Sequence, residues 1–305
     1  MNSTLVIINP KAGHGRAAKE WGEISSRVDF LRPFDERHSE YAGHIPKIVR
    51  QSLKEGTKRI LIVGGDGSLS EALNGFFEND KPIQENAILG ALPLGTGSDF
   101  LRTVGIFNID QAMERLKKNR VISIDVGEVK SLHQPQKRLF LNIASFGCSG
   151  EVVRKVNALS HRSKKWMGGG LSYLWTTLSV FLTYHSPIVK LEIENEGEKR
   201  IKINNIFVCN GKYSGGGMLW GPEADISDKR LDLTILKEIP KIRGLLEMRK
   251  VYQGRLLDSD VVERVRCREF AADASQPVPI ETDGDLFGTL PALFRIYPHR
   301  LKFWC

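Results

Sequence analysis

The sequence has little of what secreted or membrane-spanning proteins need. It contains no run of about 18 or more apolar residues, so we expect no segment that spans a bilayer. Its first residues, Met1 to Leu5, lack the charged start and long apolar core of a signal peptide. We therefore expect a cytoplasmic protein with at most peripheral contact with the inner face of a membrane.

Cysteine is scarce, and the few cysteines lie far apart in the sequence. They form no Cys-x-x-Cys pair and no metal-ligand spacing, so the sequence gives no sign of a disulfide framework or a zinc module. We expect buried, unreactive thiols in a reducing compartment. The four cysteines are Cys148, Cys209, Cys267 and Cys305.

The chain has 305 residues and a formal net charge of +8, with 41% hydrophobic and 26% charged residues. This composition is ordinary for a globular protein, and the length suffices for two domains. The surplus of positive charge favours an anionic partner. It does not choose between a nucleotide, a nucleic acid and a membrane surface.

The most informative stretch, residues 59–75, joins a buried strand to a helix through a glycine turn. Arg59 to Val63 is an apolar run typical of a parallel strand, and helical spacing of apolar residues follows Gly64-Gly65-Asp66-Gly67-Ser68. Such a turn lets a phosphate approach the backbone at a helix start. Because Asp66 would repel a phosphate, we expect Mg²⁺ or a hydroxyl nearby. The alternative is an ordinary tight turn.

Two more glycine turns follow predicted strands, at residues 9–16 and 93–100. Neither contains a Walker A pattern or Gly-x-Gly-x-x-Gly. Ligands of doubly wound α/β domains bind beyond the carboxyl ends of the strands, so three such turns can converge on one ligand. The sequence thus predicts a doubly wound α/β nucleotide-binding domain over residues 1–125, with 292–305 as a candidate last strand.

The remaining local structure of this half is predicted from apolar spacing and capping residues. Phe30 to Phe34 is expected to form a strand interrupted by Pro33. Apolar residues at helical spacing predict a helix from Ile45 to Leu53. Asn108 is expected to cap the helix that begins at Ile109.

From residue 121 the pattern changes to mostly antiparallel β structure. We expect a β-sandwich domain over residues 126–291, interrupted by helical insertions near 150–185 and 241–257. The predicted strands are 121–130, 138–146, 188–194, 201–209, 231–236, 261–270, 278–282 and 292–303.

The helical insertions allow different interpretations. The first contains the basic stretch His161-Arg162-Ser163-Lys164-Lys165, followed by Trp166 and Met167. It is either a solvated loop beside a packed helix or an element that faces a membrane. The second insertion is interpreted as core packing through Leu245, Leu246, Met248, Val251 and Leu256.

Two clusters of acidic residues in the second half of the sequence suggest a metal site and a catalytic base. Asp225 and Asp228 lie in a loop whose oxygens suit a hard cation such as Mg²⁺ or Ca²⁺, although such side chains also cap their own turns. Asp283 and Asp285 flank Gly284 at a strand end. Two carboxylates this close raise one pKa and can create a base, whereas the alternative is an ordinary hairpin turn.

Taken together in order and spacing, these segments resemble the diacylglycerol kinase catalytic family, which includes bacterial lipid kinases and the sphingosine and ceramide kinases. The resemblance covers nearly the whole chain. Its segments are Asn9-Pro10-Lys11-Ala12-Gly13, Gly64-Gly65-Asp66-Gly67-Ser68 with Glu71 and Asn74, residues 93–100, Pro222-Glu223-Ala224 with Asp228, and Thr282-Asp283-Gly284-Asp285.

The resemblance implies transfer of the γ-phosphoryl group of ATP to the hydroxyl of a lipid such as diacylglycerol at a membrane surface, with Mg²⁺ and without nucleic acid. Asp283 would be the general base, and Asp285 would support nucleotide or metal. Asp225, Asp228 and the backbone oxygen of Arg230 would hold a structural Mg²⁺. The implied nucleotide-binding residues are Asn9, Pro10, Lys11, Ala12, Gly13, Ser39, Gly64, Gly65, Asp66, Gly67, Ser68, Leu69, Ser70, Glu71 and Thr96.

The sequence departs from the family pattern at a few positions. Ser68 replaces Thr, Asp285 replaces Glu, and Ser98 stands where Asn or a similar residue is usual. Lys229 stands where a glycine usually follows the metal-loop aspartate, which puts the structural metal in question. An NAD kinase and a non-catalytic nucleotide or lipid sensor are the alternatives. The lipid and the oligomeric state, including a homodimer, stay open.

Overall fold

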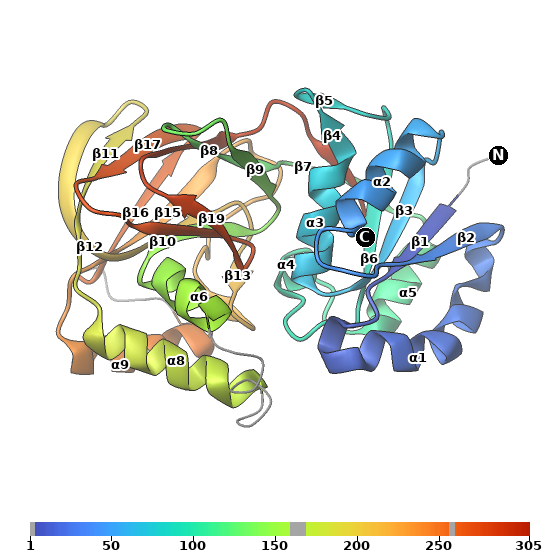
Figure 1. Ribbon diagram of the computed structural model, residues 1–305, viewed down its shortest axis with the longest axis horizontal. Coiled ribbons are helices and arrows are strands. Elements are labelled where there is room, and N and C mark those ends of the chain that lie inside the picture. The colour runs from blue at the N-terminus through green and yellow to red at the C-terminus, as the bar shows by residue number, and fades with distance from the viewer. Residues whose placement is uncertain (1–3, 159–168, 256–259) are drawn as a thin grey trace.

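The computed structural model describes residues 4–158, 169–255 and 260–305. Two bodies lie side by side, a β-rich one with helices along one edge and an α/β one that contains both ends of the described chain (Figure 1). The basic stretch 161–165 and Trp166 with Met167, for which the sequence left two interpretations, lie outside the described residues. Within the described residues, no helix is both long and apolar enough to cross a bilayer.

The N-terminal body is built on a six-stranded sheet in the order β2-β1-β3-β6-β21-β7. All neighbouring strands are parallel except β7, which runs antiparallel to β21. The inner strands are apolar and fully covered, as the continuous apolar runs predicted. The strands are β1 (Thr4–Ile8), β2 (Phe34–His38), β3 (Arg59–Gly64), β6 (Ile88–Pro93), β7 (Val121–Ile124) and β21 (Leu301–Trp304).

Helices lie on both sides of this sheet, with α2 and α3 on one side and α1 and α5 on the other (Figure 1). Asn108 caps α5 through a 2.9 Å hydrogen bond from the Gln111 N–H, as the sequence predicted. The helices are α1 (Arg16–Ser25), α2 (Ile45–Lys54), α3 (Asp66–Phe76), α4 (Asp99–Thr103) and α5 (Ile109–Lys117), with 3₁₀ turns at Ala12–Gly15 and Ser26–Leu31 and a small hairpin of β4 (Phe77–Glu78) and β5 (Lys81–Pro82).

The predicted strand from Phe30 to Phe34 is wrong. Residues 26–31 form a 3₁₀ turn that buries Val28 and Leu31, three residues apart, and the strand begins only at Phe34. This strand, β2, is an edge strand with mostly exposed polar side chains. An edge strand needs no apolar run, which is why the sequence pattern concealed it.

The C-terminal body is a mostly antiparallel β structure in which β12 connects two layers. β12 pairs with β11 in its first half and with β10 and β15 in its second half. Phe146, Phe270 and Phe294 stack in the core between the layers, with ring centroids 4.9–5.4 Å apart. The strands are β8 (Gly127–Ser131), β9 (Lys137–Phe140), β10 (Ile143–Gly147), β11 (Ile188–Ile193), β12 (Gly197–Cys209), β13 (Tyr213–Ser214), β14 (Met218–Leu219), β15 (Leu231–Lys237), β16 (Val262–Cys267), β17 (Glu269–Ala274), β18 (Pro279–Thr282), β19 (Asp285–Thr289) and β20 (Ala292–Ile296).

Several predicted strands are divided in the structure. The stretch 121–130 forms β7 and β8, and 292–303 forms β20 and β21, in each case with the two strands in different sheets. The stretches 138–146 and 261–270 also form two strands each. Because both strands of such a pair are buried, the apolar pattern continues from one strand into the next. The pattern therefore cannot show where the chain leaves one sheet for another.

Among the described residues, three helices cover one edge of the C-terminal body: α6 (Cys148–Ala158), α8 (Gly169–Thr183) and α9 (Lys241–Tyr252). The interpretation of 241–257 as core packing is correct for Val251, which is buried. It is wrong for Leu245 and Leu246, which are exposed together with Ile242, while Leu256 lies outside the described residues. The four cysteines are buried and free, as expected.

Hydrogen bonds fasten the two bodies together. The Asn74 amide, on α3, donates to the Leu139 carbonyl at 2.9 Å and accepts from the Leu139 N–H at 3.0 Å. The buried Asp125 accepts from the Lys229 N–H at 2.6 Å and from Arg300 Nε at 2.8 Å. Arg300 Nη2 also donates to the Ser227 carbonyl at 2.8 Å. Arg300 thus joins two segments: the one at Asp125, where the chain passes from β7 to β8, and the acidic loop that contains Ser227.

Replacing Arg300 by Met should destabilise the protein by about 3 kcal/mol, because Asp125 would be left as a buried carboxylate without its cation. The measurement is the shift of the urea unfolding midpoint. Lys118→Met is the control, because Lys118 and Glu114 form an exposed pair that is worth less than about 1 kcal/mol. Equal shifts in the two variants would contradict this account of Arg300.

Candidate active site

The three glycine turns meet at the carboxyl ends of β1, β3 and β6, which are neighbours in the sheet. A Cβ on Gly95 would lie 2.2 Å from the Gly65 Cα, and one on Gly13 would lie 2.4 Å from the Leu94 oxygen. Real Cβ atoms do not approach other atoms so closely, so these positions require glycine. The convergence predicted from the sequence is therefore present in the structure.

Side chains reinforce this junction. Asn9 donates through Nδ2 to the Ser68 hydroxyl at 2.8 Å, and its Oδ1 accepts the Lys11 N–H at 3.1 Å. Arg16 reaches from the first turn to the Pro93 carbonyl of the third at 3.1 Å. A Cβ on Gly67 would meet no atom within 4 Å. These hydrogen bonds therefore fix the N-terminus of α3, while the space beside Gly67 stays open. A fixed and accessible helix N-terminus is what an anion site requires.

The other residues expected around the nucleotide fall into two groups. Ser39 is buried at the end of β2, and its N–H donates to the Ile8 carbonyl at 2.9 Å. Glu71 accepts the Gly43 N–H at 3.0 Å, which joins α3 to the loop before α2. Thr96 is exposed on the third turn, whereas Leu69 lines the cavity described below. Ser39 and Glu71 thus have structural contacts, and Thr96 is accessible.

The Asp66 carboxylate accepts hydrogen bonds from the protein's own backbone. Its two carboxylate oxygens accept the backbone N–H groups of Asp99 and Phe100, each at 3.0 Å. These N–H groups begin α4, whose positive end suits a carboxylate. The start of α4 therefore stabilises the Asp66 carboxylate, and the Mg²⁺ or hydroxyl expected near Asp66 stays a prediction.

Asp99 is a buried carboxylate that the sequence analysis left out of the site. Its Oδ2 accepts the Gly216 N–H at 2.7 Å from the second body, while Arg102 lies 3.6 Å from its Oδ1. Burial raises the pKa of Asp99, and the nearby Asp66 charge adds to this effect. The signal was present in the sequence, because Asp99 lies within the third glycine turn, residues 93–100.

Asp283 sits in a tight turn between β18 and β19. Its Oδ2 accepts the Leu141 N–H at 3.0 Å, and its Oδ1 accepts the N–H groups of Asn142 and Ile143 at 3.1 and 3.2 Å. The Ser70 hydroxyl, from α3, also contacts this carboxyl group. Burial nevertheless raises the pKa of Asp283 to about 6, because the loss of solvation outweighs these hydrogen bonds.

The Asp283 backbone has φ = 49°, a left-handed conformation that is costly for a residue other than glycine. Such a conformation persists where the surroundings fix it. Here the Asp283 N–H donates to the Ile143 carbonyl at 2.9 Å, and the side chain returns to the same strand. These contacts of the turn therefore fix the position of the Asp283 carboxyl group.

Glu281 lies directly behind this turn and was not predicted as a site residue. Its Oε2 accepts the Gly284 N–H at 2.8 Å, and its Oε1 accepts the Ser145 hydroxyl. Ser149 and Asn205 continue this buried polar chain, with distances of 2.6 and 2.8 Å. Burial raises the pKa of Glu281 to about 7. A charge pattern alone could not distinguish it from an exposed strand residue.

Asp285 is more exposed than Asp283. Burial of its carboxyl group still raises the pKa of Asp285, and Arg138 opposes this shift. None of its described hydrogen bonds involves a glycine turn. Support of the nucleotide or a metal by Asp285 therefore stays a prediction.

A cavity of about 470 Å³ extends from the junction of the two bodies into the C-terminal body. One end is lined by Asp66, Asp99 and Asp283, and the other by apolar side chains of the strands and of α6, α8 and α9. Its size and apolar lining suit a small or lipid-like molecule. The cavity thus joins the carboxylates at the glycine turns to an apolar interior.

The acidic loop binds its own backbone, as the structural alternative predicted. Asp225 Oδ1 accepts the Ser227 N–H and hydroxyl at 2.9 and 2.6 Å, and Asp228 Oδ1 accepts the Arg230 N–H at 2.9 Å. In the part of the chain that the structure describes, no three acidic, histidine or cysteine side chains group as metal ligands. Lys229 adopts φ = 61°, so the loop keeps the left-handed conformation that a glycine would favour.

Comparisons with known proteins agree with this architecture. Residues 3–129 match the family described as the diacylglycerol kinase catalytic domain, and residues 142–305 match the YegS C-terminal NAD kinase beta sandwich-like domain. A YegS-like lipid kinase of Pseudomonas fluorescens is 30% identical over 247 residues, 80% of this chain and 76% of the relative. A diacylglycerol kinase of Mycobacterium tuberculosis is 25% identical over 314 residues, 99% of this chain and 94% of the relative.

The crystal structure of a diacylglycerol kinase from Bacillus anthracis has the same fold, with a TM-score of 0.72 at 20% identity, covering 99% of this chain and 96% of that one. Both halves of the chain match their family over nearly their full extent, and the predicted resemblance is confirmed. The chain belongs to the diacylglycerol kinase family of lipid kinases and is a phosphotransferase.

Proposed function

We propose that this lipid kinase transfers the γ-phosphoryl group of ATP to a lipid hydroxyl at the junction of its two bodies, with Asp283 as the general base. The observation that carries the proposal is the position of Asp283 between the glycine turns and an apolar cavity. The Ser70 contact brings Asp283 to α3, whose N-terminus is open to phosphate. The acceptor lipid would lie in the cavity with its hydroxyl beside Asp283.

In this reaction the acceptor O–H bond breaks and its proton passes to the Asp283 carboxylate. The acceptor oxygen forms a bond to the γ-phosphorus, and the bond from that phosphorus to the leaving ADP oxygen breaks. Such transfers depend on positioning and on neutralisation of charge rather than on protein nucleophiles. The backbone N–H groups at the start of α3 would bind the phosphates, together with the turn formed by Asn9 to Gly13.

The residues at the junction suit Mg²⁺. Asp66 and Asp99 are hard oxygen ligands at one end of the cavity, and Asp99 Oδ1 is buried without a hydrogen-bond donor among the described residues. When bound, Mg²⁺ would neutralise negative charge on the phosphates. These carboxylates would hold the ion while Asp283 stays available for the proton.

The family match favours a lipid acceptor over the NAD kinase alternative. We also propose that the protein meets its lipid at the inner membrane surface by peripheral contact and needs no nucleic acid. Diacylglycerol is the acceptor that we propose first, because a relative is named for it.

Replacing Asp283 by Asn should lower kcat by about 10²- to 10⁴-fold, since Asn cannot take the acceptor proton. ATP binding should persist, because the glycine turns are unchanged. The measurement is transfer from ATP radiolabelled in its γ-phosphate to diacylglycerol in mixed micelles, alongside nucleotide binding. Asp273→Asn, at an exposed position on β17, is the matched control. A non-catalytic sensor would bind ATP in both variants and transfer nothing in wild type.

The pH dependence of kcat/KM should fall below about pH 6, by about tenfold per unit, because Asp283 must be ionised to act as a base. An ordinary exposed aspartate would keep the activity down to about pH 4. In the control Glu281→Gln the loss of activity should stay near about pH 6, because burial raises the pKa of Glu281 to about 7 and its carboxyl group is already mostly neutral where Asp283 titrates. A profile that is flat through about pH 5 to 7 would exclude Asp283 as the base.

We further propose that Asp225, Asp228 and the Arg230 carbonyl bind a second Mg²⁺ outside the active site. The loop bonds described above use Oδ1 of each aspartate, and the nearest cation to Asp228 Oδ2 is Arg266 at 3.8 Å. The exposed Asp225 therefore keeps an oxygen for a hard cation.

If this second site exists, Mg²⁺ without nucleotide should raise the thermal unfolding midpoint of wild type, because it binds only the folded state. The increase should be absent in Asp225→Asn/Asp228→Asn and retained in Asp260→Asn, an exposed aspartate elsewhere. An equal increase in the double variant would show that the loop does not bind the ion.

A further inference from the structure

The helices α8 and α9 form a joint cover over the cavity. Phe181, on α8, leaves no room for a Cβ at Gly244, on α9, because that atom would lie 2.3 Å from its ring. Lys241 donates to the Tyr184 carbonyl at 2.7 Å and lies 5.2 Å from the Phe181 ring centroid. The inward faces of both helices line the cavity. The two helices are therefore packed together as one unit. A surface that contacts their outer face lies directly against a wall of the cavity.

The outer face of this cover is apolar. On α9, Ile242, Leu245 and Leu246 fall at i, i+3 and i+4, so they share one side of the helix, opposite the buried Val251. On α8, Trp175 and Leu182 are seven residues apart and also share one side. The exposed fractions are 66% for Trp175, 50% for Leu182, 79% for Ile242, 38% for Leu245 and 61% for Leu246.

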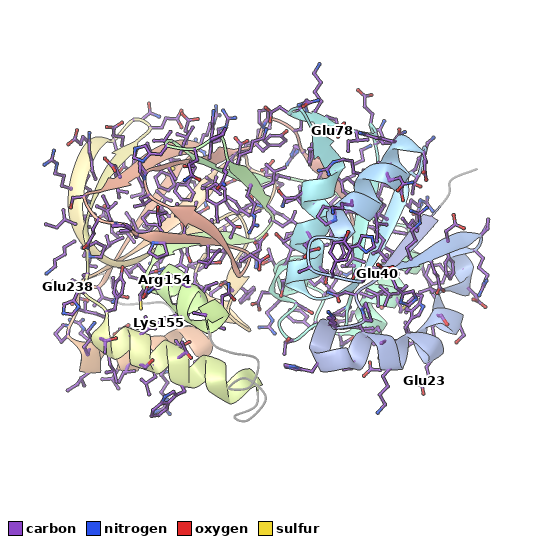
Figure 2. All side chains as sticks on the ribbon, viewed as in Figure 1. Glu23, Glu40, Glu78, Arg154, Lys155 and Glu238 are labelled. Carbon is purple, nitrogen blue, oxygen red and sulfur yellow. The ribbon has the colours of Figure 1, made fainter. Side chains whose placement is uncertain are left out.

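Positive charge is in excess near this apolar face, although Arg243 pairs with Asp260, Lys250 with Glu247 and Arg154 with Glu151. Residues 237–255, which include α9, contain six lysines and arginines and two glutamates, whereas α8 has no charged residue. Arg249 lies on the same side of α9 as Leu245 and Leu246 and is exposed. Figure 2 shows Arg154 and Lys155 of α6 on the same edge of the C-terminal body as α8. Apolar side chains beside an excess of cations match the chemistry of an anionic bilayer surface.

We propose that the outer face of α8 and α9, defined by Trp175, Leu182, Ile242, Leu245 and Leu246, docks on an anionic phospholipid bilayer and admits the acceptor lipid from it into the cavity. This inference rests on the proposed function for the identity of the cavity's occupant. A lipid that entered from water would expose each methylene of its chains, at a cost in free energy. A cavity wall lying on the bilayer removes that step.

The bilayer is favoured over a second copy of this chain as the occupant of the face. Two such faces would bring the cations of α9 against each other, whereas an anionic surface neutralises them. An exposed tryptophan such as Trp175 is also typical of the membrane–water interface.

The test is sedimentation of the full chain with vesicles of phosphatidylcholine and phosphatidylglycerol. Ile242→Ser/Leu246→Ser should weaken vesicle binding by at least about tenfold, because two interfacial apolar side chains are lost. Phe107→Ser/Leu132→Ser is the control, since Phe107 and Leu132 are exposed to 65% and 52% at sites away from this face. Binding should weaken on vesicles of phosphatidylcholine alone.

Quenching of tryptophan fluorescence by brominated lipid gives an independent readout, which Trp175→Phe should reduce. Equal loss of vesicle binding in both double variants, or no loss in either, would overturn the proposal. So would a wild-type dimer in sedimentation equilibrium that Ile242→Ser/Leu246→Ser dissociates while vesicle binding is unchanged.

Activity measurements separate this proposal from the proposed function. The variant of the docking face should lose transfer to diacylglycerol in vesicles and keep transfer to a short-chain acceptor dissolved as monomers. Vesicle binding that needs this face, together with no transfer to any lipid, would reject the kinase mechanism and leave the docking surface standing.

Discussion

The proposed active site depends on one balance, between burial of the Asp283 carboxyl group and the hydrogen bonds that hold it. Three backbone N–H groups from residues 141–143 fix its position, and burial still raises its pKa to about 6. A carboxylate with the same hydrogen bonds in water would be a weaker base. The Ser70 hydroxyl of the α/β body also contacts this carboxyl group, so the proposed chemistry would take place where the two bodies meet.

The other side of the site depends on how closely backbones can approach. Gly65 and Gly95 are in contact, and the Asp66 carboxylate caps α4 through the N–H groups of Asp99 and Phe100. The turns after β3 and β6 are therefore one rigid unit. Asn74, Asp99 and Asp125 then fasten this unit to the second body through backbone groups. Polar side chains at the junction thus position the site as well as filling it.

Much of this could be predicted from the sequence, because glycine and aspartate mark places where the backbone geometry is special. The three turns, the α/β and antiparallel halves and Asp283 were all visible as local patterns. Lys229 stands where a glycine is usual, and the structure shows it in the left-handed conformation that a glycine would favour.

What the sequence did not show comes from distant contacts. Glu281 is buried only because Ser145 and the Gly284 N–H meet it, and Asp99 is part of the site only because Gly216 approaches from the other body. β2 was missed because an edge strand can be polar, and α9 was misinterpreted because an apolar helix face does not reveal what covers it.

The central claim is that phosphate passes from ATP to a lipid hydroxyl in this chain. The most direct measurement incubates the protein with ATP radiolabelled in its γ-phosphate, Mg²⁺, NAD and micelles that contain a panel of hydroxyl-bearing lipids. The account predicts label in one or more organic-soluble lipid phosphates and none in NADP. Label that appears only in NADP, or only as free phosphate, would contradict it.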